Sequence, residues 1–526
     1  MITETMRSEA AAPEIVVSPR WGPAVTAGVG IVVLIGLVLR FWTRSHLWLD
    51  EALTVNIASL PVRQIPHALR RDGAPPVYYY LLHFWIRAFG TSSFAVRSLS
   101  GVCSVLAIPP MWFASRRIVG GRDARVAGLV GVVLLASSPF AIRYATETRM
   151  YSFVALLVFV GYLLLARILE RATPRTADLV LFALVCAVLA LTHYWALYLL
   201  VVVAAGLAVQ SVRAAPDRRR AYRMALGAMV VGGVLFLPWV PTFWFQLRHT
   251  GTPWSSPASF AAMVNAISEF AGGVSSNGRA LALTFFALSG FGLFGAATDR
   301  TKVEIDLRTR PRGRGVAIVV AGTLAVAIGA GLVSGGAFAA RYAAVVFPPF
   351  LLLIVLGTTV FLDRRVLAGV VVAATIFGFA GGRENVITDR SQAGQVAATL
   401  KAQYRPGDVI GYCPDQLAPS ASRLLPASWV QYTFPRRTGP RFVNWVDYAK
   451  VNGAADPDAF ARFLDEKAGP GHTVWLVWAS QYRTFGAKCE EVAAYLGDMR
   501  PGVNQLFEAD TDHFFEHANL VRFPPR

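Results

Sequence analysis

Long apolar stretches recur between residues 24 and 382 and alternate with short polar segments. A stretch of about 18 or more apolar residues can cross a bilayer as a helix. The sequence therefore predicts a polytopic α-helical membrane protein with about eleven transmembrane helices. These lie near residues 24–42, 94–115, 124–142, 150–168, 178–195, 196–212, 224–245, 280–297, 316–334, 342–362 and 366–382. The fifth and sixth stretches run together and are either two short helices or one broken helix.

The two ends of the chain lack this pattern. Residues 1–23 are polar and have no signal-peptide pattern, so we expect a disordered cytoplasmic tail before the membrane domain of residues 24–382. From residue 383 to residue 526 the apolar runs shorten and the charged residues increase. β-like runs at 408–412 and 473–478 alternate there with helical patterns at 457–467 and 488–496. We therefore expect a small soluble α/β domain.

Composition and charge support the assignment to membrane proteins and indicate the orientation of the chain. Hydrophobic residues make up 55% of the chain, charged residues 16%, and the formal net charge is +18. The arginines collect in alternate loops, which places those loops and the N-terminus in the cytoplasm and the C-terminal domain outside. The charge is spread over many short loops, so it indicates topology and contact with membrane lipids, and no nucleic-acid partner is expected. The basic loops cover residues 116–125, 167–175, 213–223, 300–314 and 364–365.

The interiors of the predicted spans are free of Asp, Glu, Lys and Arg near their centres. Ion-coupled transporters place ionisable groups near the middle of the bilayer, so this class is disfavoured. The polar residues gather instead in the outer loops, which suits a substrate with its tail in lipid and its head in water.

The first outer loop, residues 43–93, holds the main candidates for chemistry. Asp50 and Glu51 follow the first span closely and lie at the membrane surface, where carboxylates can face a lipid-linked substrate. Asp72 precedes Pro75-Pro76, and a helix with Tyr78 near its start follows. That aromatic helix is either a simple interfacial anchor or part of a binding site.

The second outer loop carries Glu147, Arg149 and Tyr151. A helix that begins near Thr146 would put Glu147 and Tyr151 on one face. It would also place Arg149 beside free backbone N–H groups, where a phosphate can bind. The alternative for Arg149 is an ordinary arginine at a span end.

Two further outer loops add His193 and the pair Arg341-Tyr342. His193 is either an interfacial residue or a substrate contact. Arg341 is the only basic residue of its loop, and it follows the small residues 334–337, which let a ligand headgroup approach the backbone.

Four cysteines occur in the chain, two within apolar spans and two, Cys413 and Cys489, in the C-terminal domain. In an oxidising compartment the latter pair forms a disulfide or remains as two buried thiols. No cysteine or histidine cluster has metal-ligand spacing, so no cofactor is assigned, and a divalent metal stays open without a ligand cluster to support it.

In this order and on one side of the membrane, the outer-loop residues resemble membrane glycosyltransferases of the GT-C fold. The likeness is to protein O-mannosyltransferases and aminoarabinose transferases, especially bacterial mannosyltransferase-like proteins, over about residues 24–360. It is carried by Trp48-Leu49-Asp50-Glu51, Asp72 with Pro75-Pro76-Val77-Tyr78-Tyr79, Glu147-Thr148-Arg149-Met150-Tyr151, His193-Tyr194 and Arg341-Tyr342.

The resemblance implies a polyprenyl-phosphate sugar donor and a lipid, glycan or protein acceptor outside the cytoplasm. Asp50 would be the general base and Glu51 would assist it. Arg149 and Arg341 would hold the donor phosphate, and transfer would invert the sugar. The substrate-binding residues would be Asp72, Tyr78, Glu147, Tyr151, His193 and Tyr342. Asp72-Gly73-Ala74-Pro75-Pro76 departs from the aminoarabinose-transferase pattern by lacking an adjacent lysine, so aminoarabinose is a poor candidate sugar.

Two other functions remain open from the sequence. A flippase or transporter for lipid-linked glycans requires a polar path through the spans. A non-catalytic scaffold of cell-envelope assembly shares the fold without the reaction. High alanine, glycine, arginine and valine usage suggests a bacterium, so we expect a multi-pass protein of the bacterial plasma membrane.

Overall fold

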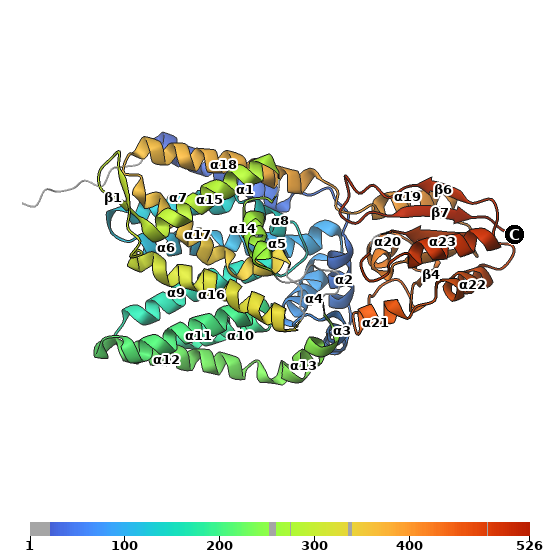
Figure 1. Ribbon diagram of the computed structural model, residues 1–526, viewed down its shortest axis with the longest axis horizontal. Helices are drawn as coiled ribbons and strands as arrows, with labels where there is room; N and C mark the ends of the chain where they lie inside the picture. The colour runs from blue at the N-terminus through green and yellow to red at the C-terminus, as the bar shows by residue number, and fades with distance from the viewer. Residues whose placement is uncertain (1–21, 252–258, 274, 335–338, 481) are drawn as a thin grey trace, which may run out of the picture.

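The computed structural model describes residues 22–251, 259–273, 275–334, 339–480 and 482–526. The expected tail lies outside these residues up to position 21, and so does most of the small-residue run at 334–337. A bundle of long helices forms one end of the molecule and the C-terminal domain forms the other (Figure 1). Short helices lie between the two parts.

A helix occurs at each of the eleven predicted span positions. Seven helices of the described residues, or eight with the bent pair α7–α8, are long and apolar enough to cross a membrane. The bundle consists of α1 (Pro23–Phe41), α5 (Ser93–Leu106), α6 (Ile108–Val119), α7 (Ala124–Ser137), α8 (Pro139–Ala145), α9 (Tyr151–Glu170), α10 (Thr176–Ala190), α11 (Trp195–Arg213), α12 (Pro216–Val234), α13 (Val240–His249), α14 (Phe260–Phe270), α15 (Ser276–Phe294), α16 (Pro311–Ser334), α17 (Phe347–Gly357) and α18 (Arg364–Ile387). A short hairpin, β1 (Gly295–Ala297) with β2 (Val303–Ile305), follows α15.

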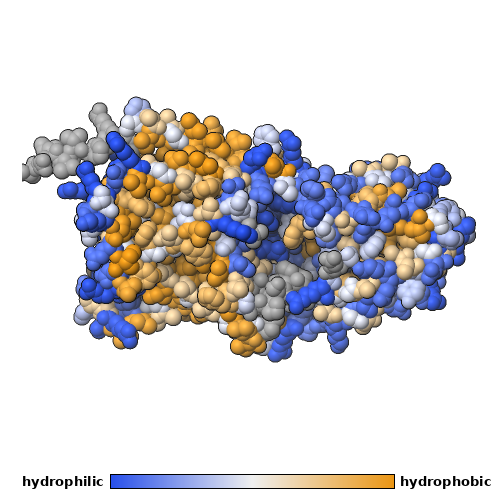
Figure 2. Space-filling model, turned by 45° about the horizontal axis from the view of Figure 1, so that its top comes forward, coloured by the Kyte–Doolittle hydropathy of each residue, from blue (hydrophilic) through white to orange (hydrophobic). Residues whose placement is uncertain are grey.

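The bundle surface shows why these helices suit a bilayer. Apolar side chains form a broad band across the face of the bundle that Figure 2 shows, and hydrophilic residues lie at the end opposite the C-terminal domain. The chain is therefore a multi-pass membrane protein. The junction near His193 resolves into two helices, because α10 ends at Ala190 and α11 begins at Trp195.

One helix start differs from the sequence expectation. The expected helix from Thr146 does not form, because α8 ends at Ala145 and α9 begins only at Tyr151. The Thr146 hydroxyl donates to the carbonyl of Arg143 (2.9 Å), and this bond closes the last turn of α8. Glu147 therefore lies in a turn, and it does not share a helix face with Tyr151.

The C-terminal domain is built on a five-stranded sheet of order β4-β3-β5-β7-β6. Strand β3 is parallel to β4 and β5, whereas β7 is antiparallel to β5 and β6. The expected strands and helices are confirmed here as β3, β5, α22 and α23. The domain consists of α19 (Ala393–Gln403), β3 (Val409–Cys413), α20 (Ala418–Ser422), β4 (Val430–Thr433), α21 (Tyr448–Gly453), α22 (Pro457–Ala468), β5 (Val474–Trp478), α23 (Lys488–Met499), β6 (Asn504–Phe507) and β7 (Asn519–Phe523).

Helices cover both faces of this sheet. Val409 packs in one apolar cluster with residues of α22 and α23, whereas Ile410 packs in another with α19 and α20. Alternate residues of a strand point to opposite faces, so a strand covered on both faces is apolar throughout. The predicted disulfide is confirmed, since Cys413 at the end of β3 is bonded to Cys489 in α23.

The basic aromatic stretch 431–437 is partly built into the interior of this domain. Gln431 accepts a hydrogen bond from Tyr412 (2.8 Å), and Phe434 is buried. Arg436 donates to the carbonyl of Val446 (2.9 Å), and Arg437 donates to that of Ala459 (2.9 Å).

The C-terminal domain rests on three short helices at the end of the bundle: α2 (Leu49–Ala58), α3 (Ile65–Asp72) and α4 (Val77–Phe89). The Asn56 side chain donates to the carbonyl of Arg441 (2.7 Å), and the Trp445 amide donates to that of Arg71 (3.1 Å). Apolar residues of α2 share a buried cluster with the domain. Nearly every residue of α2 is consequently buried.

A buried carboxyl in this domain generates a pH prediction. Asp415 is 3% exposed. Burial raises its pKa to about 7, although the Tyr448 hydroxyl donates to it and Arg436 lies nearby. The folded protein therefore holds this proton up to about pH 7, whereas an unfolded Asp releases it near pH 4. Its contribution to stability is present at low pH and is lost as the pH rises through 7.

We expect Asp415→Asn to reduce the loss of stability of the full chain between pH 5 and pH 8 by roughly 2–3 kcal/mol. Thermal unfolding in detergent at both pH values measures it. Asp512→Asn, at an exposed carboxylate, is the matched control. An unchanged pH dependence in Asp415→Asn would contradict the expectation.

Candidate active site

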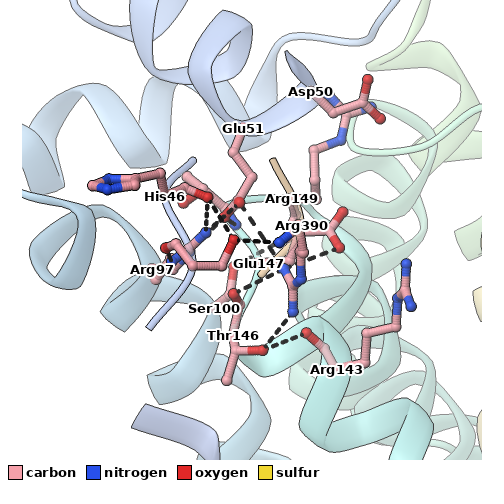
Figure 3. A network of polar contacts seen from close by, with 12 residues as sticks. His46, Asp50, Glu51, Arg97, Ser100, Arg143, Thr146, Glu147, Arg149 and Arg390 are labelled. Atoms are coloured by element: carbon pink, nitrogen blue, oxygen red, sulfur yellow. Dashed lines mark hydrogen bonds and ion pairs between the residues drawn. The ribbon is translucent and has the colours of Figure 1, made fainter. Parts of the chain in front are cut away.

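The site is organised around the first turn of α2, which carries Asp50 and Glu51. Successive residues of a helix differ by about 100° in direction, so two neighbouring acids cannot face the same way. The side chain of Asp50 is 17% exposed, whereas that of Glu51 is 0% exposed. Asp50 points away from the cluster that surrounds Glu51 (Figure 3).

Asp50 faces a cation that is distant from it in the sequence. Arg341 lies in the 3-10 helix η4 (Ala340–Val345), and its Nη2 is 3.4 Å from Asp50 Oδ2. The Arg341 guanidinium is also within 5.7 Å of the ring centres of Trp48 and Tyr342. The structure thus brings together two candidates that are almost 300 residues apart in the sequence.

Arg149 is the second cation near Asp50. Its Nη1 donates to the Thr54 hydroxyl, one helical turn after Asp50 (2.9 Å). Burial lowers its pKa, but the nearby Asp50, Tyr79 and Asp72 outweigh burial and raise the pKa well above its ordinary value. Arg149 is therefore always charged and within electrostatic reach of Asp50.

Asp72 completes this group of charges. It ends α3, where Gly73 with φ 88° turns the chain, and its Oδ2 accepts from the Tyr79 hydroxyl (2.8 Å). Burial raises the pKa of Asp72, while Arg149 and the Tyr79 hydroxyl oppose the rise. Asp50, Asp72, Arg149 and Arg341 together form what we call the polar centre.

Glu51 lies in a separate, buried network. Arg97 from α5 donates to both carboxylate oxygens, at 2.7 Å to Oε1 and 2.5 Å to Oε2, and the Thr148 amide donates to Oε1 (2.9 Å). Burial alone would raise the pKa of Glu51, but Arg97 and then Arg390 lower it below the ordinary value. Glu51 thus ties α2 to α5 and to the turn before α9.

Glu147 and Arg390 extend this network. Arg390 Nη1 lies 3.5 Å from Glu147 and 3.9 Å from Glu51, and it donates to the carbonyl of Thr146 (3.2 Å). Glu147 is 1% exposed, and its pKa is raised by burial against the charges of Arg390 and Arg143. The structure therefore places Glu147 in the network rather than in the polar centre.

Aromatic residues pack beside the polar centre. Tyr151 and His193 have ring centres 5.7 Å apart, and His193 and Tyr342 have theirs 5.8 Å apart. His193 lies in the turn between α10 and α11, where burial and then Arg149 lower its pKa to about 3. A histidine that stays neutral at pH 7 cannot donate a proton as an imidazolium. Tyr78 is fully buried, and its hydroxyl contacts that of Ser100 (2.9 Å).

Two residues of the network carry no signal in the sequence. Arg97 lies near the start of an apolar stretch, where an arginine is typical of a span end. Arg390 lies just beyond the last span and belongs to no motif. Within the described residues, no group of three or more His, Cys, Asp and Glu side chains is arranged to hold a metal ion.

The network predicts the cost of losing Arg97. Arg97→Met would leave Glu51 buried without its bidentate partner, and breaking a buried pair in this way costs about 3–5 kcal/mol. We expect a marked loss of folded protein and a lower thermal midpoint. Glu51→Leu combined with Arg97→Met should recover part of the stability.

Arg44→Met is the matched control, because Arg44 is an exposed arginine close by. A thermal midpoint of Arg97→Met equal to that of Arg44→Met would show that the pair does not hold α2.

Known proteins resemble this chain in sequence and fold. The family model for dolichyl-phosphate-mannose-protein mannosyltransferase matches residues 73–241. No curated protein sequence matches the chain significantly.

Three solved structures share the arrangement at low sequence identity. ArnT from Cupriavidus metallidurans in the apo state is 14% identical with a TM-score of 0.57, over 95% of this chain and 98% of that chain. The same ArnT bound to undecaprenyl phosphate is 15% identical with a TM-score of 0.55, over 95% and 97%. The Archaeoglobus fulgidus oligosaccharyltransferase in complex with Zn and sulfate is 12% identical with a TM-score of 0.50, over 86% and 67%.

These likenesses confirm the fold class expected from the sequence. The chain has the fold of these GT-C membrane glycosyltransferases, and its residues 73–241 match the family model for dolichyl-phosphate-mannose-protein mannosyltransferase.

Proposed function

We propose that the chain transfers a sugar, mannose or a similar one, from a polyprenyl-phosphate donor to a hydroxyl acceptor outside the cytoplasm. One observation carries this proposal: a partly exposed carboxylate, Asp50, lies opposite two arginines, Arg149 and Arg341. A base next to an anion-binding pair is what such a transfer requires. Two matching structures support the donor class, since ArnT is bound to undecaprenyl phosphate and archaeal oligosaccharyltransferase AglB (12% identical, TM-score 0.50) to dolichol-phosphate.

Asp50 is the general base in this mechanism. Its carboxylate takes the proton of the acceptor hydroxyl as the oxygen attacks the anomeric carbon. The bond from that carbon to the phosphate oxygen breaks on the opposite face, so the configuration inverts. Glu51 holds α2 in place through Arg97, which keeps Asp50 directed toward the polar centre.

The arginines act on the leaving group. The departing lipid phosphate gains negative charge, and Arg149 and Arg341 stabilise it without reorganisation because both are already fixed by contacts. Phosphate is a good leaving group, so no general acid is needed. Asp72, Tyr342, Tyr151 and His193 line or support the donor's binding site, whereas Tyr78 and Glu147 support it from buried positions.

The orientation of the chain in the membrane follows from the distribution of its basic residues. The C-terminal domain lies at one end of the bundle, and the β1–β2 hairpin, which includes part of the basic loop 300–314, lies at the other end (Figure 1), which is hydrophilic (Figure 2). Cytoplasmic loops are enriched in arginine and lysine. We therefore place the N-terminus in the cytoplasm and the C-terminal domain outside the plasma membrane of a bacterium.

Loss of the base should abolish transfer. We expect Asp50→Asn to lower kcat by about 10²–10⁴-fold while the protein stays folded. The assay follows release of radiolabelled sugar from a panel of polyprenyl-phosphate sugars in purified membranes. Asp512→Asn is the control, and wild-type rates in Asp50→Asn would exclude Asp50 as the base.

Loss of an arginine that binds the donor phosphate should impair use of the donor. We expect Arg341→Ala to lower kcat/KM for the donor by about 10²–10³-fold, because one charged partner of the leaving phosphate is removed. Arg341→Lys should retain part of the rate, since it keeps the charge but not the geometry of the guanidinium. Arg437→Ala, at an exposed arginine of the C-terminal domain, is the control. Equal donor kinetics for Arg341→Ala and Arg437→Ala would remove Arg341 from the site.

A further inference from the structure

A carboxylate of the C-terminal domain is directed at the first residue of α2. Glu516 lies between β6 and β7 and is 5% exposed. Its Oε2 accepts a hydrogen bond from the backbone N–H of Leu49 (2.5 Å). Its Oε1 accepts from the hydroxyls of Ser391 (2.9 Å) and Ser420. All these partners donate and favour an accepting group, although burial raises the pKa of Glu516 to about 7.

Helix α2 has no cap of its own. The first N–H groups of a helix lack partners inside it, and usually the side chain of the preceding residue accepts from one of them. That residue is Trp48, whose indole cannot accept such a bond, and no side-chain cap is formed there. The Trp48 ring instead packs edge to face on Phe515 (5.2 Å). The residue that follows Phe515 supplies the missing acceptor.

Glu516 is itself held firmly. Its amide donates to the carbonyl of Arg390 (2.8 Å), and its carbonyl accepts from the amide of Gln392 (2.9 Å). The Arg390 amide donates to the hydroxyl of Ser45, just before α2 (2.8 Å). The Arg390 side chain belongs to the buried network around Glu51 and Glu147. The Glu516 cap is therefore held by Arg390, which also belongs to the buried network that holds Glu51 in α2.

We propose that Glu516 is a positioning residue for sugar transfer, through which the C-terminal domain caps α2 and fixes the direction of the Asp50 carboxylate. This inference rests on the proposed role of Asp50 as the base. Asp50 is the residue after Leu49, so movement of the Leu49 backbone moves Asp50 directly. A misplacement of about 1 Å at a reacting group can cost about 10²-fold in rate.

The test compares Glu516→Ala and Glu516→Gln with Asp512→Asn in the purified full chain. Asp512 lies in the same segment, and its side chain is exposed. We expect kcat to fall about tenfold in Glu516→Ala, because a cap of this kind contributes about one power of ten in an equilibrium, with the KM for the donor changed less than about twofold. Glu516→Gln keeps an accepting oxygen but loses the charge, so its kcat should lie between that of the wild type and that of Glu516→Ala.

A second measurement does not depend on activity. Hydrogen exchange of the backbone amides of residues 48–52 should be about tenfold faster in Glu516→Ala than in the wild type and unchanged in Asp512→Asn. If Glu516→Ala does not fold, Glu516→Gln, which has the same shape, carries both measurements.

The outcomes separate the two proposals. A wild type that transfers sugar, with Glu516 variants of normal kcat or with a proportional rise in KM, overturns the positioning role alone. Unchanged exchange in residues 48–52 overturns the cap. A wild type that uses no donor of the panel overturns the proposed function and the positioning role with it, while the exchange data still decide whether Glu516 caps α2.

Discussion

The buried ion pair between Glu51 and Arg97 is the constraint on which the site depends. A carboxylate at 0% exposure is tolerated only because Arg97 binds both of its oxygens and the Thr148 amide adds a third donor. These bonds fix the rotation of α2 about its axis. Asp50, one residue earlier, must then point elsewhere, and the direction left to it is toward Arg149 and Arg341. Two adjacent acids thus have different surroundings: one anchors the helix, and the other stays partly exposed opposite Arg341.

The sequence predicted the membrane fold well because bilayer thickness and apolar length are directly linked. It also predicted the residues of the polar centre, since charged residues at span ends on one side of a membrane must share a surface. Asp50 and Arg341 meet for that reason, although the chain between them crosses the membrane many times. The strands and helices at 409–413, 457–468, 474–478 and 488–499 followed from their hydrophobic periods, and the disulfide joins the two cysteines expected to pair.

What the sequence missed depends on tertiary partners. Arg97 looked like an ordinary arginine near a span end, and Arg390 and Glu516 lie in segments without any motif. Their importance comes only from the groups they meet across long sequence distances. The incorrect helix start at Thr146 has the same origin. Arg390 binds the Thr146 carbonyl and hydroxyl, and the Arg149 amide bonds to the Glu147 carbonyl (2.7 Å), so this backbone is held in a turn despite its helical pattern.

Helix α2 is short, and this explains why so many distant segments hold it. A helix of about ten residues is marginal by itself in water, and α2 lacks both a local cap and a single apolar face. Its stability must come from groups outside it: Arg97 of the bundle on one side, and the apolar residues and Glu516 of the C-terminal domain on the other. The benefit is precision, because a helix held from two sides cannot rotate without breaking a buried ion pair or exposing a buried carboxylate. The C-terminal domain is thereby part of the architecture of the polar centre and not only a cover above it.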